Sequence, residues 1–166
     1  MSAMKRYCII PTLLGEMTAL EEQNALCGLW FSGGKHAPAV AGEWVNEPDL
    51  PLFAALREQL DAYFNGKLRS FNLTLAPRGT PFRMAVWELL RAIPSGSTTT
   101  YGALARQLAA QRDGRLPAAQ AVGGAVGHNP LTIIVPCHRV IGADGSLTGY
   151  AGGLERKAAL LALENR

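Results

Sequence analysis

The chain has 166 residues, 48% of them hydrophobic and 17% charged, so it can bury one or two small cores without metals or disulfides. Its three cysteines stand at irregular spacing, which argues against a disulfide framework or a CxxC zinc motif and favours a reducing compartment. No stretch has the pattern of a signal peptide or the apolar length of a membrane span, so we expect a cytoplasmic protein without membrane contact.

The net charge of +3 is unevenly distributed along the chain. Residues 1–75 carry 6 Lys/Arg and 8 Asp/Glu, and residues 76–166 carry 10 and 5, a net charge of −2 against +5. A basic second half suits a polyanionic partner, although ordinary scatter of surface charge gives the same count. We predict two domains with these bounds, an α/β domain at 1–75 and a second, basic domain at 76–166.

The first half has the pattern of a small α/β domain. Three short strands are predicted at residues 5–10, 15–21 and 25–32, where turn residues divide them into an antiparallel meander. A loop covers residues 32–48, after which Asp49 caps a helix that has Pro51 in its first turn. Apolar residues recur at every fourth position of this helix, and Asn65-Gly66 ends it. Residues 68–77 form a strand or a linker.

The second half is predicted to be mostly helical. Thr80 caps a first helix and Pro81 takes its first position. One face of this helix carries an apolar stripe, formed by Phe82, Ala85, Val86, Leu89, Leu90 and Ile93. A second helix follows Thr100, and a glycine-rich loop at 148–153 precedes a last helix at 154–164.

A third helix lies between these elements. A charged turn at 111–116 separates it from the second helix, and Pro117 opens it. Its buried residues are predicted to be Ala118, Val122, Ala125 and Val126. Two short helices joined by a polar turn are a candidate helix-turn-helix, a signal that many helical pairs share.

The stretch from Asn129 to Val140 has the features of a nucleophilic site. Leu131 to Val135 is apolar and β-branched and is predicted to be a short buried strand or extended segment, which Pro136 ends because proline offers no N–H to a sheet. Cys137 therefore lies where regular backbone stops, next to His138. A neighbouring base favours the nucleophilic thiolate, whereas a lone cysteine in an apolar stretch is more often an inert core residue.

The string Asn-Pro, a β-branched run and Pro-Cys-His-Arg-Val resembles the signature of the O6-alkylguanine-DNA alkyltransferases. The resemblance extends from about Thr80 to Glu164 and is weak before that. It implies an α+β fold, with a small ribonuclease-H-like α/β domain followed by a mostly helical domain with the helix-turn-helix. It also implies that a nucleotide is flipped out of the duplex and that its alkyl group, on O6 of guanine or O4 of thymine, moves to a cysteine once per protein molecule. No cofactor is implied, and Cys8, Cys27 and His36 are too irregularly spaced to predict a zinc site.

The resemblance implies a role for each residue that matches the family motif. Cys137 would be the nucleophile and alkyl acceptor, His138 would take its proton through a water molecule, and Glu164 would orient the histidine. Asn129 would tie the helix-turn-helix to the active-site segment, and Tyr101 would donate toward the departing guanine. Without the family match, Glu164 is a solvated residue near the end of the chain, Asn129 a helix cap and Tyr101 a core aromatic residue.

The same resemblance assigns the substrate pocket to Tyr150, Ala151 and Val140. The family often has Ser where Ala151 stands, so one hydroxyl donor near O6 is missing and we expect an effect on substrate range. Small residues of the third helix would let it enter the minor groove and hold phosphates through backbone amides. The DNA-binding residues expected on this basis are Gln120, Ala121, Gly123, Gly124, Thr100 and Arg83.

Two departures from the family concern DNA binding. The family usually has an arginine where Gln120 stands, and this side chain fills the space left by the flipped nucleotide. Glutamine offers hydrogen bonds but no charge. The connection 111–115 is longer than in typical members, and its Arg112 and Arg115 either restore phosphate contacts or belong to a loose surface loop.

Three functions are weighed against one another. Single-turnover transfer is favoured because Cys137, His138 and Glu164 are all present. The alternative is a lesion-binding protein of the alkyltransferase-like type, in which the cysteine is commonly replaced by Trp. A Cys-His hydrolase would need an oxyanion motif that the sequence lacks. We expect a monomer that binds double- and single-stranded DNA carrying alkylated bases and that lies at a bacterial-type nucleoid when bound.

Overall fold

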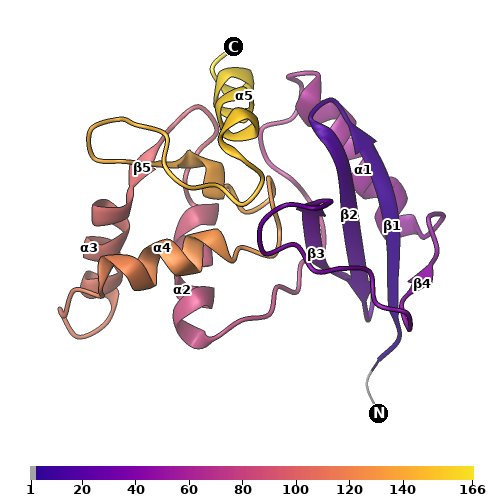
Figure 1. The fold of residues 1–166 in the computed structure, drawn as a ribbon, viewed down its shortest axis with the longest axis horizontal. Coiled ribbons are helices and arrows are strands. Elements are labelled where there is room, and N and C mark those ends of the chain that lie inside the picture. Colours follow the sequence, from indigo (N-terminus) through magenta and orange to yellow (C-terminus); the bar gives the residue numbers. More distant parts are fainter. Residues whose placement is uncertain (1–2) are drawn as a thin grey trace.

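The computed structural model describes residues 3–166 and shows two packed units, a sheet unit from the first half of the chain and a helical unit from the second (Figure 1). The strands of the sheet unit are β1 (Lys5–Thr12), β2 (Gly15–Glu22), β3 (Ala25–Phe31) and β4 (Val45–Asn46), in the order β3-β2-β1-β4. The first three form the predicted antiparallel meander. The sequence predicts a loop at β4, because its two residues lie in a stretch that contains Gly and Pro. They form a strand only because they pair with β1, which is a tertiary contact.

Helix α1 (Pro51–Phe64) packs an apolar face on the sheet, formed by Phe53, Leu56, Leu60, Tyr63 and Phe64. The prediction that Asp49 caps this helix is wrong, since Leu50 is the N-cap residue and no side chain bonds to the first turn. Pro51 is at the start of the helix, so one of the amides that a cap would satisfy is missing. The predicted end is confirmed, with Asn65 as C-cap and Gly66 at a φ of +75°.

The outer edge of β3 is where the two units join. The segment between α1 and the next helix is a linker, and it makes two backbone hydrogen bonds to Leu26, of 2.8 and 2.9 Å. Further along the same edge, the Leu29 amide donates to the Pro130 carbonyl at 2.8 Å, and the Thr132 amide donates to the Leu29 carbonyl at 2.9 Å. Strand β3 therefore holds the segment that leads to Cys137.

The helical unit contains α2 (Pro81–Arg91), β5 (Thr99–Thr100), α3 (Tyr101–Gln111), α4 (Ala119–Gly127), the 3-10 helix η1 (Cys137–Arg139), β6 (Val140–Ile141) and α5 (Leu154–Glu164). The predicted caps of α2 and α3 are confirmed. The Thr80 hydroxyl accepts from the Arg83 amide at 3.2 Å, and the Thr100 hydroxyl accepts from the Ala103 amide at 3.1 Å. Helices α2, α3 and α4 pack together, with α3 and α4 as the two helices of the predicted helix-turn-helix.

Helix α4 begins two residues later than predicted. Pro117 was expected to open it, but Ala118 has extended backbone (φ −63°, ψ 141°) and is the N-cap residue. Its side chain is exposed, contrary to the prediction, whereas Val122, Ala125 and Val126 are buried as predicted. The stripe that packs into the unit starts at Val122, so burial does not require Ala118 to be helical.

The segment before Cys137 is a tight turn and not the predicted strand. Ile133 has a φ of +74°, which an extended strand excludes, and the Val135 amide donates to the Leu131 carbonyl at 2.8 Å. Asn129 spans the turn, since its side-chain nitrogen donates to the Val135 carbonyl at 2.7 Å and its oxygen accepts from the Leu131 amide at 2.9 Å. Leu131 pairs with Leu29 at the edge of β3 through an isolated bridge, and the apolar side chains of the turn pack in the core.

Candidate active site

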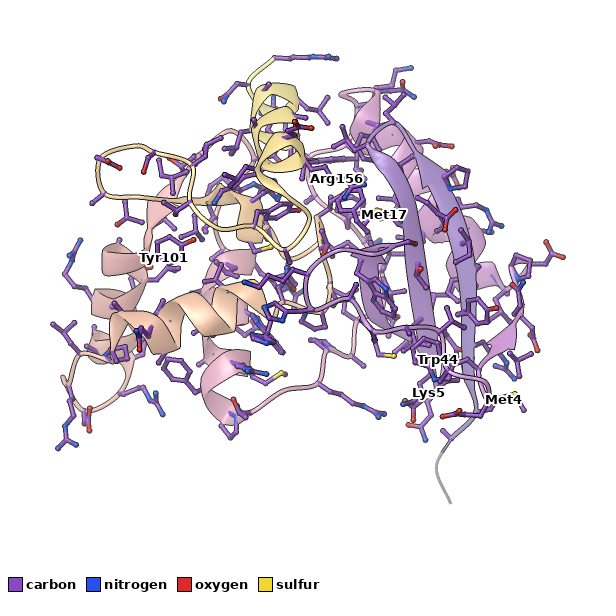
Figure 2. The ribbon with its side chains drawn as sticks, viewed as in Figure 1. Met4, Lys5, Met17, Trp44, Tyr101 and Arg156 are labelled. Atoms are coloured by element: carbon purple, nitrogen blue, oxygen red, sulfur yellow. The ribbon has the colours of Figure 1, made fainter. Side chains whose placement is uncertain are left out.

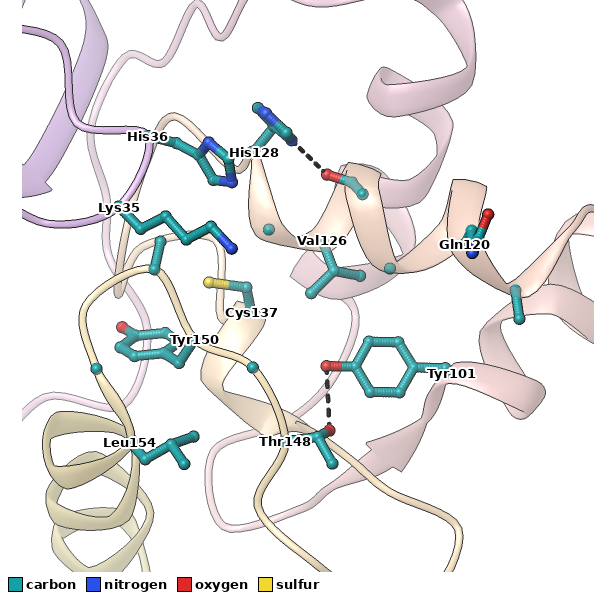
Figure 3. Close-up of a pocket in the computed structure, with 17 residues that line it drawn as sticks. Lys35, His36, Tyr101, Gln120, Val126, His128, Cys137, Thr148, Tyr150 and Leu154 are labelled. Carbon is teal, nitrogen blue, oxygen red and sulfur yellow. Dashed lines mark hydrogen bonds between the residues drawn. The ribbon is translucent and has the colours of Figure 1, made fainter.

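Cys137 lies in the wall of a cavity of about 800 Å³ between α4, the start of α3 and the glycine-rich loop (Figure 3). Only 6% of the residue is exposed. The cavity is lined by Lys35, His36, Tyr101, Ala119, Gln120, Gly123, Gly124, Val126, Gly127, His128, Cys137, Thr148, Gly149, Tyr150, Ala151, Gly153 and Leu154. Glycines and apolar side chains with a few polar groups are the usual lining of a site for a small ligand such as a base.

The cavity brings together many of the predicted site residues: Cys137, Tyr101, Gln120, Gly123, Gly124, Tyr150 and Ala151. Val140 is the exception among the predicted pocket residues. It is fully buried and pairs with Thr99 in the β5–β6 ladder, which places its side chain in the core. The other three predicted DNA-binding residues lie outside the cavity: Ala121 is exposed on α4, Thr100 caps α3 and Arg83 is in the first turn of α2. Residues of both units line this cavity, and one of them is Tyr101 at the start of α3 (Figure 2).

His138 is fully buried and is held by a carboxylate. Its Nε2 lies 2.7 Å from Oε2 of Glu164, at the end of α5. Glu164 also accepts two hydrogen bonds from Arg139, at 2.8 and 2.9 Å, and one from the hydroxyl of Tyr63 at 2.6 Å. Helices α1, α5 and η1 thus meet at one buried carboxylate.

This carboxylate decides which nitrogen of His138 carries the proton. Burial alone would raise the pKa of Glu164, but hydrogen bonds from His138 and Arg139 outweigh it and lower that pKa to about 2. The ionised carboxylate can only accept, so Nε2 carries the hydrogen and Nδ1 keeps its lone pair. Burial lowers the pKa of His138 despite the opposing effect of Glu164, which keeps the ring neutral at neutral pH. Within residues 3–166 the buried Nδ1 has no hydrogen-bond partner, so it is available as a base.

The surroundings of Cys137 act on its thiol in opposite directions. Burial raises the pKa of Cys137, whereas the Asn129 side chain and the charge of Lys157 oppose the rise. Lys157 is fully buried in α5, and its ammonium donates to the carbonyls of Thr148 at 2.6 Å and Gly149 at 3.4 Å. A buried ammonium whose acceptors are all neutral carbonyls favours a nearby anion, so the charge of Lys157 would stabilise Cys137 when its thiol ionises.

Sequence reasoning missed three of these residues. Arg139 stands inside the Pro-Cys-His-Arg motif, so its position was a signal that it could meet a buried anion. Lys157 lies on the same helical face as Leu160 and Glu164, at spacings of three and seven, which was a signal for an inward-facing lysine. Tyr63 carries no such signal, because it is 101 residues from Glu164 and fits the apolar stripe of α1.

The face of α4 that lines the cavity is open at its glycines. The glycines of α4 are Gly123, Gly124 and Gly127. A Cβ added at any of them would meet no atom within 4 Å outside the helix's own backbone. Gln120 is exposed in the first turn of the helix. In the connection before α4, the guanidinium of Arg112 lies 5.6 Å from the centroid of the Phe82 ring. One part of this long turn is therefore packed on α2.

The other two cysteines lie in the sheet unit. Burial raises the pKa of Cys8 to about 11, and burial also raises the pKa of Cys27. Across residues 3–166, no three His, Cys, Asp or Glu side chains gather where they could hold a metal ion. None of the helices in this range combines the length and apolar character that a membrane span needs.

The structure has a helix-turn-helix beside a cavity lined by a thiol, and a neutral imidazole and a cation are buried behind that cavity wall. This combination defines a class, the nucleic-acid-binding proteins with a nucleophilic cysteine. Two family models match the chain. The ribonuclease-like domain of 6-O-methylguanine DNA methyltransferase matches residues 5–77, and the DNA binding domain of 6-O-methylguanine DNA methyltransferase matches residues 81–166. The chain therefore belongs to the 6-O-methylguanine DNA methyltransferase family.

Similar proteins cover nearly the whole chain. The methylated-DNA–protein-cysteine methyltransferase of Mycolicibacterium paratuberculosis is 45% identical over 98% of this chain and 94% of its own length. The enzyme of the same name from Methanosarcina acetivorans is 44% identical over 95% and 97%. Among solved structures, Mycobacterium tuberculosis OGT in complex with DNA superposes with a TM-score of 0.85 at 43% identity, over 96% of this chain and 92% of that one.

Proposed function

We propose that this chain repairs DNA by moving the alkyl group from O6 of an alkylated guanine, or O4 of an alkylated thymine, to Sγ of Cys137 once per molecule. One observation carries the proposal: Cys137 is the cysteine that lines the cavity, and the next residue is a neutral imidazole held by a carboxylate. The matched DNA-binding domain and the DNA complex of the M. tuberculosis relative support DNA as the partner. We propose that the protein acts as a monomer on double- and single-stranded DNA, in the cytoplasm at the nucleoid.

The reaction is a displacement at the alkyl carbon. The proton of Cys137 passes to Nδ1 of His138, directly or through one solvent molecule, and Glu164 stabilises the imidazolium that forms. The sulfur then bonds to the alkyl carbon as the bond from carbon to O6 breaks, and the electron pair of that bond stays on the guanine. The product is a thioether, which has no proton to lose and is a poor leaving group, so each molecule reacts once.

The departing guanine is an anion that needs hydrogen-bond donors. The hydroxyl of Tyr101 accepts from Thr148 at 3.5 Å, which leaves its own hydrogen free to donate into the cavity. Tyr150 lies on the opposite side of Cys137 (Figure 3). Its buried hydroxyl has no partner among the described residues, and burial raises its pKa well above 10, so it stays protonated. Both hydroxyls can stabilise the charge that develops on the base, whereas Ala151 adds no donor.

The test is mass spectrometry of the intact protein and of its peptides after incubation with an oligonucleotide that contains O6-methylguanine. We expect one methyl group per molecule, on Cys137, in the wild type and in the matched control Cys27→Ser. Cys137→Ala should accept no methyl group and still bind the oligonucleotide, because binding belongs to α4 and its neighbours.

The other outcomes identify other functions. A methyl group on Cys8 or Cys27, or transfer that persists in Cys137→Ala, contradicts the assignment. Tight lesion binding by an unmodified wild-type protein indicates a damage sensor. Release of a dealkylated product over many turnovers indicates a hydrolase.

A further inference from the structure

The rim of the Cys137 cavity is completed by the sheet unit. Lys35 and His36, in the loop that follows β3, line the cavity together with residues of the helical unit (Figure 3). The Lys35 amide donates to the carbonyl of Ala151, in the glycine-rich loop, at 2.9 Å. At Gly34 a Cβ would lie 3.0 Å from the same carbonyl oxygen, so the two loops approach this closely because this residue is a glycine.

A histidine pair fixes the other side of this loop. The rings of His36 and His128 lie 3.9 Å apart between centroids, at an angle of 30°. His128 ends α4, and its Nδ1 carries a hydrogen that it donates to the Gly124 carbonyl at 2.8 Å, since a carbonyl can only accept. Partial loss of solvation and the neighbouring His128 lower the pKa of the exposed His36, so this ring is neutral at neutral pH. The loop is therefore held on both sides of the Lys35 side chain.

Lys35 is the one permanent cation among the residues that line the cavity, and this lining contains no Asp or Glu. Its side chain is exposed, and no carboxylate within residues 3–166 pairs with it. Figure 3 shows its ammonium end turned toward the space between α4 and Cys137. A nucleotide whose base enters this cavity brings its own phosphate to the rim, and a free ammonium at that place is a phosphate ligand.

We propose that Lys35 binds the backbone phosphate of the nucleotide whose base enters the Cys137 cavity, so that the sheet unit takes part in DNA binding; this rests on the proposed function. Helix α4 presents the neutral Gln120 to the DNA, and Lys35 supplies a charge from the other side of the cavity. The contact holds the flipped nucleotide and leaves the chemistry at Cys137 unchanged.

The test compares Lys35→Gln with wild type, with Lys35→Arg, which keeps the charge, and with Lys67→Gln. Lys67 is another exposed lysine of the sheet unit, and it does not line the cavity. Single-turnover transfer is measured over a range of concentrations of an O6-methylguanine oligonucleotide. DNA affinity is measured at several salt concentrations in the Cys137→Ser background, where no transfer takes place.

We expect Lys35→Gln to raise the half-saturating DNA concentration about three- to tenfold, as for one lost phosphate contact, with the transfer rate at saturation unchanged. The slope of log affinity against log salt should become shallower by about 0.9 on duplex DNA and about 0.7 on single strands. Lys35→Arg and Lys67→Gln should resemble wild type.

Two results overturn the inference. In the first, Lys35→Gln has the same half-saturating DNA concentration and salt slope as Lys67→Gln. In the second, Lys35→Gln has a lower transfer rate at saturation and an unchanged salt slope. Wild-type protein that binds the oligonucleotide but leaves the methyl group in place overturns the proposed function instead, and the salt slopes then still decide whether Lys35 contacts the phosphate.

Discussion

Replacing Glu164 by glutamine removes the charge at the centre of the buried network while it keeps the shape of the side chain. In the structure this carboxylate accepts hydrogen bonds from His138, Arg139 and Tyr63. Glutamine leaves Arg139 as a buried cation without an anion. The side-chain amide of the glutamine can also donate to Nε2 of His138. The ring proton then lies on Nδ1, and this atom can no longer act as the base.

The lowered pKa of Glu164 sets the size of the effect. It falls from the usual 4.5 to about 2, and at about 1.36 kcal/mol per unit the ionised form stabilises the folded state by about 3 kcal/mol. Because the folded pKa lies below the unfolded one, this stabilisation is fully present above about pH 4.5 and is lost as the pH falls toward 2. We expect Glu164→Gln to be about 3 kcal/mol less stable than wild type at pH 7, and about half of that difference to remain at pH 3.

The assay is urea unfolding of both proteins at pH 7, 5 and 3. Burial lowers the pKa of His138, so wild type also loses stability below its usual pKa of 6.5, and comparing the two proteins at each pH removes the part of this loss that does not depend on Glu164. Glu88→Gln, on the exposed side of α2, is the control and should stay within about 0.5 kcal/mol of wild type. Methyl transfer by Glu164→Gln should fall about 100-fold. An equal loss of stability at pH 7 and pH 3 would refute the argument from charge.

Three further predictions concern other parts of the site. Gln120→Arg should speed transfer from duplex lesions more than from single-stranded ones, because duplex DNA carries the cost of unstacking, and equal rates on both would mean that Gln120 is already adequate. Lys157→Met should move the pH profile of Cys137 alkylation by iodoacetamide to higher pH while Lys157→Arg leaves it in place; an unchanged profile in the Met variant would limit Lys157 to holding the glycine-rich loop. Methylated Cys137 adds volume to a packed site, at a cost of about 1–3 kcal/mol, so calorimetry should show a melting temperature several degrees lower after reaction, and a raised value would mean a roomier cavity.

Much of the local structure could be predicted from neighbouring residues, because the forces that form it act within a few positions. The meander follows from turn residues between short apolar runs, and its turn at Gln23 and Asn24 has the positive φ that such residues adopt. Thr80 and Thr100 cap their helices because a hydroxyl reaches the amide three residues on. The motif around Cys137 is equally local, and it is enough to distinguish this cysteine from Cys8 and Cys27.

The failed predictions are those in which one local pattern allows two structures. The β-branched run before Cys137 suits a strand and a buried turn equally, and the hydrogen bonds of Asn129 select the turn. Val140 has the same hydrophobic character as a pocket residue, but its pairing with β5 directs it into the core. Asp49 has a capping side chain, yet the helix begins at Leu50 and Pro51 without using it.

By itself the sequence determined most of the helices and strands, the family motif and which cysteine is the candidate nucleophile, because these depend on the residue types within short stretches. Only the tertiary structure decided what surrounds Cys137. It brings Tyr63 to Glu164 across 101 residues, buries Lys157 where its charge acts on the thiol and places Lys35 at the rim of the cavity. The contacts of Tyr63 and Lys35 join residues far apart in the sequence, which no local pattern can predict. Burial keeps the imidazole neutral, and the hydrogen bonds of His138 and Arg139 keep the carboxylate ionised.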